Sequence, residues 1–303
     1  MRYNNNSLSR LERKPFDYYE LCYERFKNDD HVQILKELFY EKLGYKLCVE
    51  SPRTYNEKLQ WLKLYWRDDN ATICSDKYEV KKYLKEKGFS DILIDTLGIY
   101  NNVDEIEFHK LPSKYVIKAT HASGYNLFVS NSSLLDTERA KKVLNKILNI
   151  PYYASKLEWN YEAIKPRLII EPLLPISLER PLDFKFYCFH GEVEFVEITT
   201  ACEWDYKFEP REMIVDKSFN RLNFSYSFEN SLLVQKPNDF DNMVEIATKL
   251  SSPFPHVRID LLNPVDGIIK FGEFTFFPSA GFGVFNPQEI DTVMGNRLHL
   301  ELR

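Results

Sequence analysis

The chain has 303 residues, 40 Lys and Arg against 45 Asp and Glu, and a formal net charge of −5. Such a length can bury a sizeable core, as one large unit or as two to three smaller lobes. The acidic balance argues against a nucleic-acid-binding protein, which usually presents a basic domain. The sequence contains no stretch apolar enough to span a membrane and no apolar segment typical of a signal peptide at its start. We therefore expect a cytoplasmic protein, and peripheral contact with membrane-bound assembly machinery stays open.

The five cysteines are odd in number and match no zinc-binding spacing, which favours free thiols in a reducing compartment. The first fifty residues have apolar groups at helical spacing, mainly between Asp17 and Leu43. Thr54 followed by Glu57 forms a capping box, in which each side chain satisfies a backbone donor near the other. Three segments are predicted after this point: a helix over Tyr55–Trp66, a helix over Asp76–Lys87 closed by Gly88, and a strand over Ile92–Tyr100.

The middle of the chain predicts a hairpin, a helix and a buried strand. The predicted segments are a strand over Lys114–Lys118, a glycine-bearing turn over His121–Asn126, a strand over Leu127–Ser130, a helix over Asp136–Leu148 and a strand over Arg167–Glu171, followed by breaks at Pro172 and Pro175.

The last part is rich in strands. His190-Gly191 is a hairpin turn between two alternating segments. The predicted segments are strands over Asp183–Phe189 and Glu192–Ile198, a helix over Asp241–Leu250, and strands over Val257–Leu262 and Ile268–Phe277 joined by an Asn-Pro-Val-Asp-Gly turn. The whole chain is predicted to be α+β with mostly antiparallel sheet.

The strongest functional pattern is Arg258-Ile-Asp260 followed by Glu273-Phe-Thr275. Arg258 and Asp260 lie on one face of a strand, and Glu273 on the partner strand can face Asp260. Oxygen ligands on a rigid sheet suit Mg²⁺, which keeps waters and phosphates as its other ligands. Arg258 can hold a phosphoryl oxygen or an anionic intermediate. A surface cross-strand pair is the alternative, but the surrounding phenylalanines indicate burial, and buried carboxylates need partners.

Four weaker signals each have an ordinary structural alternative. Lys118 ends a strand before a glycine turn and can reach nucleotide phosphates, or it is an edge-strand lysine. Glu171 ends an apolar strand in a hinge segment, whose backbone can bond a nucleobase edge. Asp183 and Lys185 share a strand face, as functional groups or as a plain salt bridge. His121 is a candidate general base, or a loop histidine bonded to backbone.

The chain contains, in this order, the strand lysine Lys118, a glycine turn, the hinge glutamate Glu171, the second strand lysine Lys185 and the two carboxylate motifs. This ordered set resembles the ATP-grasp superfamily. The closer resemblance is to the TupA-like ATP-grasp family, associated with teichuronopeptide and polysaccharide biosynthesis. It covers roughly residues 50 to 300 and is carried by SPRTYNEKLQWLKL, SDKYEVKKYL, LPSKYVIKATHASGYN, IIEPLL, DFKFYCFHG, VRIDLL and FGEFTFFPSAGF.

The resemblance implies an ATP-grasp fold, in which two α+β lobes grip ATP between mostly antiparallel sheets. The expected parts are a helical N-terminal extension over 1–50, a substrate-side lobe over 51–110, a central lid lobe over 111–175, and a C-terminal lobe with the magnesium site over 176–303. The implied cofactors are ATP and Mg²⁺. A mobile lid around the predicted glycine turn would keep water from the reaction.

Site residues follow from the resemblance together with the patterns above. The expected ATP-binding residues are Lys118, Ser123, Gly124, Glu171, Leu173, Leu174, Asp183 and Lys185. The expected metal ligands are Asp260, Glu273 and Thr275, and the expected catalytic residues are Arg258, Lys185 and His121. Thr275 stands where many family members have Asn, and its shorter hydroxyl leaves direct metal contact open.

The implied reaction is ATP-dependent amide formation between a carboxylate and an amine through an acyl-phosphate. The implied partners are a uronic acid of a surface polysaccharide (capsule or O-antigen) or its nucleotide-sugar precursor, and an amino acid or small amine. Arg53, Lys58 and Arg67 could meet an anionic acceptor, or form a solvated helix face. A kinase or glycosyltransferase of the same pathway and a non-catalytic nucleotide-binding protein remain alternatives.

Overall fold

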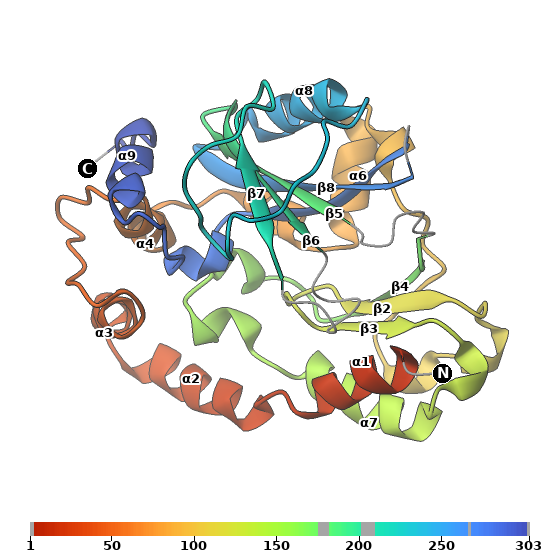
Figure 1. Cartoon of the computed structure of the whole chain (residues 1–303). Coiled ribbons are helices and arrows are strands. Elements are labelled where there is room, and N and C mark those ends of the chain that lie inside the picture. Colours follow the sequence, from red (N-terminus) through yellow and green to blue (C-terminus); the bar gives the residue numbers. More distant parts are fainter. Residues whose placement is uncertain (1–2, 175–181, 201–209, 266–267, 302–303) are drawn as a thin grey trace. The chain divides into compact units, whose positions relative to one another are not determined.

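A computed structural model gives the fold and describes residues 3–174, 182–200, 210–265 and 268–301 (Figure 1). The chain divides into two compact units, each discontinuous in sequence. Unit 1 comprises residues 1–29 and 68–175, and unit 2 comprises residues 30–67 and 176–303. None of the described helices is both long and apolar enough to cross a membrane. The four-part division expected from the sequence stays a prediction.

Unit 1 is built on an antiparallel sheet of four strands in the order β1-β4-β2-β3. Helices α1 and α7 lie alongside the β2–β3 pair (Figure 1). Their apolar side chains and those of the sheet form one core, in which Ile117, Leu144 and Ile170 are fully buried. The strands are β1 Gly98–Tyr100, β2 Tyr115–Ala119, β3 Asn126–Val129 and β4 Leu168–Pro172, and the α-helices are α1 Tyr3–Glu12, α2 Phe16–Asn28, α5 Asp69–Ser75, α6 Glu79–Glu86 and α7 Thr137–Leu148.

Unit 2 is built on an antiparallel sheet of five strands in the order β7-β6-β5-β8-β9. Its strands are β5 Leu182–Phe189, β6 Glu192–Thr200, β7 Glu212–Val215, β8 His256–Val265 and β9 Ile268–Thr275. Its α-helices are α3 His31–Leu43, α4 Tyr55–Tyr65, α8 Phe240–Ser251 and α9 Glu289–Arg297.

The two faces of the unit 2 sheet differ in chemistry because side chains alternate along each strand. Phe184, Phe186 and Ile259 share one face and are fully buried. Helix α8 covers this face, and its Phe240 ring lies 6.0 Å from that of Phe186 (Figure 1). The opposite face carries the charged side chains described below, so the apolar face supports the polar one.

Helix α4 starts with the predicted capping box, and its polar side chains hold the C-terminal segment of unit 2. Asn56 donates to the carbonyl of Gly283 and to the Asp291 carboxylate. The Lys58 ammonium donates to the carbonyls of Gly295 and Leu298, both at 2.7 Å, which satisfies carbonyls at the end of α9. The donors of Asn56 and Lys58 on the polar inner face of this helix are thereby paired with acceptors of the C-terminal segment.

Most of the predicted helices and strands are confirmed within one or two residues. The confirmed elements are α4, the β2–β3 hairpin, α7, β4, the β5–β6 hairpin, α8 and the β8–β9 pair. Of the predicted Asn-Pro-Val-Asp-Gly turn, Asp266 and Gly267 lie outside the described residues, as do Pro175 and Cys202. Cys22, Cys48, Cys74 and Cys188 are free thiols.

Three predictions from the sequence were wrong in detail. Within Ile92–Tyr100 only Gly98–Tyr100 forms a strand. The helix expected from Asp76 begins at Glu79, because the Asp76 carboxylate accepts from the backbone N–H of Tyr78 and Glu79. The segment expected to be helical between Asp17 and Leu43 is helical, but it is divided into α2 and α3 at Asp29 and Asp30. Strand β7 and helices α5 and α9 were not predicted.

The contact between α4 and α9 predicts a strong effect at one glycine. A Cβ added at Gly295 would lie 2.1 Å from the Arg53 carbonyl oxygen, and backbone atoms there cannot move aside. We expect Gly295→Ala to lower the free energy of unfolding by about 1–3 kcal/mol or more. The control Val293→Ala, at an exposed position of α9, should change it by less than about 0.5 kcal/mol. Urea denaturation measures both, and equal effects would contradict the packing described.

Candidate active site

The polar face of the unit 2 sheet carries a row of four charged side chains, here called the charged row. Glu197 of β6, Lys185 of β5, Asp260 of β8 and Glu273 of β9 are direct cross-strand partners in that order. Each therefore stands about 5 Å from the next, measured between Cβ atoms. The predicted facing of Asp260 and Glu273 is confirmed.

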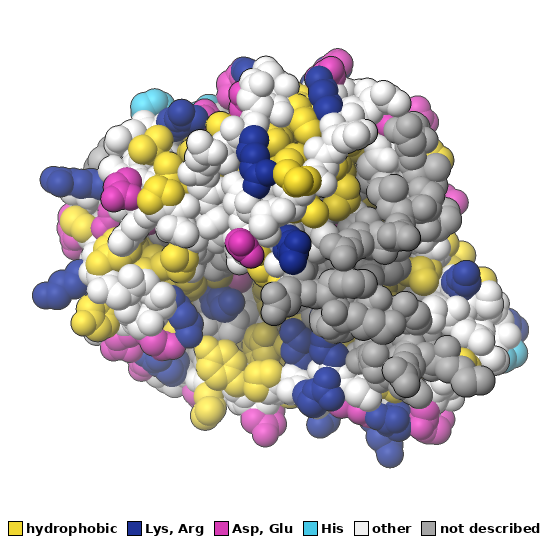
Figure 2. Space-filling view, in the orientation of Figure 1, with side chains coloured by type: hydrophobic (Ala, Val, Ile, Leu, Met, Phe, Trp, Pro, Cys, Tyr) yellow, Lys and Arg dark blue, Asp and Glu magenta, His cyan; other side chains and the backbone are white. Residues whose placement is uncertain are grey.

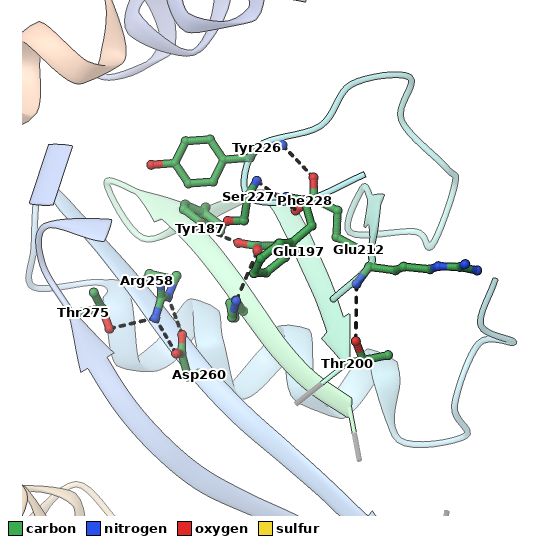
Figure 3. Close-up of polar contacts among 12 residues, drawn as sticks. Tyr187, Glu197, Thr200, Glu212, Tyr226, Ser227, Phe228, Arg258, Asp260 and Thr275 are labelled. Carbon is green, nitrogen blue, oxygen red and sulfur yellow. Dashed lines mark hydrogen bonds and ion pairs between the residues drawn. The ribbon is translucent and has the colours of Figure 1, made fainter. Parts of the chain in front are cut away.

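Arg258 joins the carboxylates of Asp260 and Glu273, which would otherwise repel one another; Figure 3 shows its contacts with Asp260 and Thr275. Its guanidinium donates to both oxygens of Asp260 at 2.6 Å, and it lies 3.4 Å from Glu273 and 3.1 Å from the Thr275 hydroxyl. The Thr275 hydroxyl donates to Glu273 at 2.8 Å. Burial raises the pKa of Asp260, and the Arg258 guanidinium opposes that shift. A planar, bidentate cation is suited to this geometry.

A glycine on β9 allows the close approach of the two strands at this point. The register shifts between Asp260 and Leu261, which pair with Glu273 and Phe271 and leave Gly272 in a bulge. A Cβ at Gly272 would lie 3.0 Å from the Asp260 carbonyl oxygen. The bulge turns Glu273 to the polar face beside Asp260.

The other end of the charged row contains a residue that sequence reasoning missed. Glu197 is fully buried and accepts from the Lys185 ammonium at 3.1 Å and from the Tyr187 hydroxyl at 2.6 Å. Burial opposes its ionisation, but the charges of Lys185 and Arg258 hold its pKa below the usual range. The available signal was a glutamate inside an apolar strand, which needs a partner when buried.

Glu212 of β7 is a second missed carboxylate (Figure 3). It accepts from the backbone N–H of Tyr226, Ser227 and Phe228 at 2.6, 2.9 and 3.0 Å. Burial and the nearby charge of Glu197 raise the pKa of Glu212 to about 7, although the three N–H groups lower this pKa by favouring the ionised carboxylate. Its three contacts fix the segment after β7 to the edge of the sheet.

In unit 1 the structure brings two of the expected ATP-binding residues together. The buried Glu171 carboxylate accepts from the Lys118 ammonium at 2.7 Å and from the Lys81 ammonium at 2.5 Å. Burial opposes ionisation of Glu171, but the two ammonium groups keep its pKa below the usual range. Lys81 of α6 was not identified from the sequence. The hinge glutamate therefore holds the strand lysine in place.

The loop after β2 contains the other expected residues of unit 1. Ser123 and Gly124 are half-buried, and Gly124 has a φ of +75°, as the predicted glycine turn requires. His121 is buried, and burial with the nearby Lys77 lowers its pKa to about 4, so the imidazole is neutral. Leu173 and Leu174 follow β4 and are half-buried.

The remaining candidates lie in unit 2. Asp183 shares the polar face with Lys185, two residues along β5. Lys58 is engaged by the C-terminal carbonyls described above, and Arg67 donates to the carbonyls of Lys63 and Trp66. Arg53 is exposed. The roles assigned to all of these residues stay predictions.

The charged row has the chemistry that a magnesium–phosphate complex needs. Asp260 and Glu273 offer oxygen ligands on rigid neighbouring strands, and Lys185 and Arg258 beside them can neutralise phosphate oxygens. Among the described residues there is no cluster of three or more His, Cys, Asp or Glu side chains able to hold a metal. Two protein carboxylates therefore fit Mg²⁺ that keeps phosphate oxygens and waters as its other ligands.

The buried pair of Lys185 and Glu197 predicts a test on one strand. Glu197→Gln leaves the Lys185 ammonium largely buried without its counter-charge and should lower the free energy of unfolding by about 3–5 kcal/mol. Glu192 of β6 is also paired with a lysine, Lys217, but both side chains are exposed. Glu192→Gln should change stability by less than about 1 kcal/mol. Similar losses in both variants, measured by chemical denaturation, would refute the assigned role of burial.

Comparison with known proteins agrees with this fold. The family model described as TupA-like ATPgrasp matches residues 57–299. No curated protein sequence matches the chain. Among solved structures, the L-amino acid ligase from Bacillus licheniformis has a TM-score of 0.50 at 12% identity, over 92% of this chain and 66% of that one.

Two other solved structures are similar at lower scores. D-alanine–D-alanine ligase from Bacillus anthracis has a TM-score of 0.42 at 16% identity, over 74% of this chain and 67% of that one. The ATP-grasp ligase PsnB has a TM-score of 0.42 at 14% identity, over 80% of this chain and 67% of that one. The chain spans about two thirds of the length of these structures. It has the mixed α+β architecture of the ATP-grasp fold and belongs to the TupA-like ATP-grasp family.

Proposed function

We propose that the protein is an ATP-dependent carboxylate–amine ligase that forms an amide through an acyl-phosphate. The observation that carries the proposal is the polar face of the unit 2 sheet. There Arg258 contacts both Asp260 and Glu273, and Lys185 stands directly beside Asp260 in the charged row. Membership of an ATP-grasp family supports ATP as the phosphoryl donor.

The proposed reaction has two steps. A carboxylate oxygen of the acceptor attacks the γ-phosphorus of ATP, the bond to the β-phosphate oxygen breaks, and ADP leaves. The amine nitrogen then attacks the acyl carbon, loses a proton, and the phosphate leaves as the amide forms. The protein's main tasks are to position the reactants and to neutralise negative charge.

Each group on the polar face has a proposed part in these steps. Asp260 and Glu273 hold Mg²⁺, which when bound neutralises the phosphate oxygens of ATP. Lys185 binds a phosphate oxygen while Glu197 fixes its direction, and Arg258 stabilises the charge on the acyl-phosphate and on the tetrahedral intermediate. Thr275 orients Glu273 through its 2.8 Å hydrogen bond.

The loop and hinge of unit 1 supply the remaining ATP contacts in this proposal. Lys118, held by Glu171, binds a phosphate oxygen, and the backbone N–H groups around Ser123 and Gly124 cover the phosphates. The backbone at Leu173 and Leu174 borders the adenine ring. His121 of the loop stays the proposed acceptor of the attacking amine's proton; its pKa of about 4 keeps the ring neutral but also makes it a weak base.

For substrates we propose a uronic acid of a surface polysaccharide, or its nucleotide-linked precursor, and an amino acid or small amine. We also propose that the reaction takes place in the cytoplasm, where ATP is available and thiols stay reduced. A kinase of the same pathway would use the same phosphate-binding groups, so the assay must separate the two reactions.

The test is release of ADP and phosphate from Mg-ATP with UDP-uronic acids crossed against amino acids. We expect turnover only when both an acid and an amine are present, and an amide product by mass spectrometry. Asp260→Asn should reduce turnover at least about a hundredfold, because charge stabilisation by the metal is lost. Asp241→Asn, at an exposed ion pair of α8, is the matched control and should keep wild-type turnover.

The other outcomes separate the alternatives. ADP release with the acceptor alone and a phosphorylated product would identify a kinase. Absence of both turnover and Mg-ATP binding, measured by calorimetry, would contradict the ligase and leave a protein that retains the fold without the activity.

A further inference from the structure

Unit 2 contains a cavity that lies apart from the charged row. Its volume is about 440 Å³, within the range of small-molecule sites. It is bordered by the outer side of α4, the turn between β5 and β6, the loop before β8 and the segment after α9. Along β5, Lys185 and the turn residue His190 are about 15 Å apart, at the rise of a strand. The proposed ATP chemistry makes no use of this cavity.

One wall of the cavity is aromatic. Trp61 and Tyr65 are one turn apart on α4, with ring centroids 5.2 Å apart, and Trp66 follows directly. Of the three residues between the first two, Leu62 and Lys63 are buried, whereas Tyr65 is 42% exposed. The two rings are tilted by 56° to one another, so each presents a separate apolar surface at the cavity.

The facing wall supplies hydrogen-bonding groups. His190 Nε2 accepts the backbone N–H of His299 at 3.1 Å, so the proton of the neutral ring is on Nδ1. Burial and the neighbouring His299 lower the pKa of His190, which favours this neutral form. The Ser252 hydroxyl and the Glu301 carboxylate also line the cavity. Donors and acceptors thus stand opposite an aromatic wall.

The charges of the lining restrict the ligand. Its described residues include a carboxylate, Glu301, and two imidazoles, His190 and His299, but no Lys or Arg. An anionic group such as a uronate or a phosphate would find no cation to pair with. A neutral sugar ring, with an apolar C–H face and a rim of hydroxyls, matches an aromatic wall facing hydrogen-bonding groups.

We propose that this cavity binds a neutral pyranose ring of a glycan, separately from the Mg-ATP site. The Tyr65 ring stacks against the sugar face, the tilted Trp61 ring contacts the sugar's edge, and Glu301, Ser252 and His190 bond its hydroxyls. If the proposed ligase also holds, the acceptor is an oligosaccharide with a neutral sugar some distance from its uronic acid. The sugar site does not depend on that reaction, because binding needs neither ATP nor Mg²⁺.

The test is saturation-transfer NMR on the full chain with methyl glycosides of glucose, galactose and N-acetylglucosamine. We expect transfer to ring protons of at least one glycoside, quenching of tryptophan fluorescence by it, and a dissociation constant near about 1 mM. Tyr65→Ala should weaken binding about tenfold through loss of the stacking surface. Tyr40→Ala removes an aromatic ring that is 59% exposed on α3 and should leave binding unchanged.

Three results would overturn the site. No transfer to any of the neutral glycosides would do so, as would equal binding by wild type and Tyr65→Ala. Preferential binding of methyl glucuronide or of leucine amide would replace the neutral sugar by an anionic or an apolar ligand. These binding experiments omit ATP. The sugar site can therefore be refuted while the ligase assay succeeds, and it can be confirmed while the ligase assay fails.

Discussion

The contact on which the polar face of unit 2 depends is the two-pronged bond from Arg258 to Asp260. Without a cation between them, the carboxylates of Asp260 and Glu273 on adjacent strands would repel one another at short range. The guanidinium holds them together in the folded protein and thereby keeps the oxygen pair preformed. Figure 2 shows that Lys and Arg side chains are scattered over the displayed face among acidic and apolar ones, whereas on the sheet the charged side chains stand in one ordered row. In the proposed reaction, an incoming Mg²⁺ would compete with the Arg258 guanidinium for the oxygens of this pair.

The motif on β8 and β9 could be predicted from local rules because the two register shifts in this strand pair, between Asp260 and Leu261 and between Leu262 and Val265, cancel. Side chains two residues apart on a strand lie on the same face of the sheet, and a short turn places the next strand beside the first. Glu197 shows where such rules end. Counting back from the His190-Gly191 turn pairs Lys185 with Val196, which turns Glu197 toward α8. The register shift between Tyr187 and Cys188 moves the pairing by one residue and brings Glu197 to the polar face. A bulge reverses which face a side chain occupies, and the sequence carries no clear mark of it.

The same contrast holds for the fold. Periodicity was sufficient for α7 and, together with the predicted Thr54 cap, for α4; the cap of α7, Asp136, was placed one residue inside the predicted helix. The prediction failed for the short elements α5 and β1, because their structure depends on contacts with neighbours distant in sequence. Strand β1 is held by pairing of Gly98 with Ile170. Helix α9 has little amphipathic pattern and is stabilised through contacts with α4, such as the bond of Asp291 to Asn56. Tertiary contacts override local preference in such segments.

Helix α4 and the C-terminal segment depend on one another across long stretches of the chain. The Asn56 amide reaches the Gly283 carbonyl over 227 residues, and the Lys58 ammonium reaches Leu298 over 240. On the ribosome, α4 is made long before these partners exist, and its buried polar face must wait in water until they emerge. Unit 1 lies between the two halves in sequence, so its long middle segment is synthesised while unit 2 is still incomplete. Contacts of such high sequence separation slow folding, since the intervening chain must be ordered first. The order of synthesis thus makes assembly of unit 2 the late event in maturation of the protein.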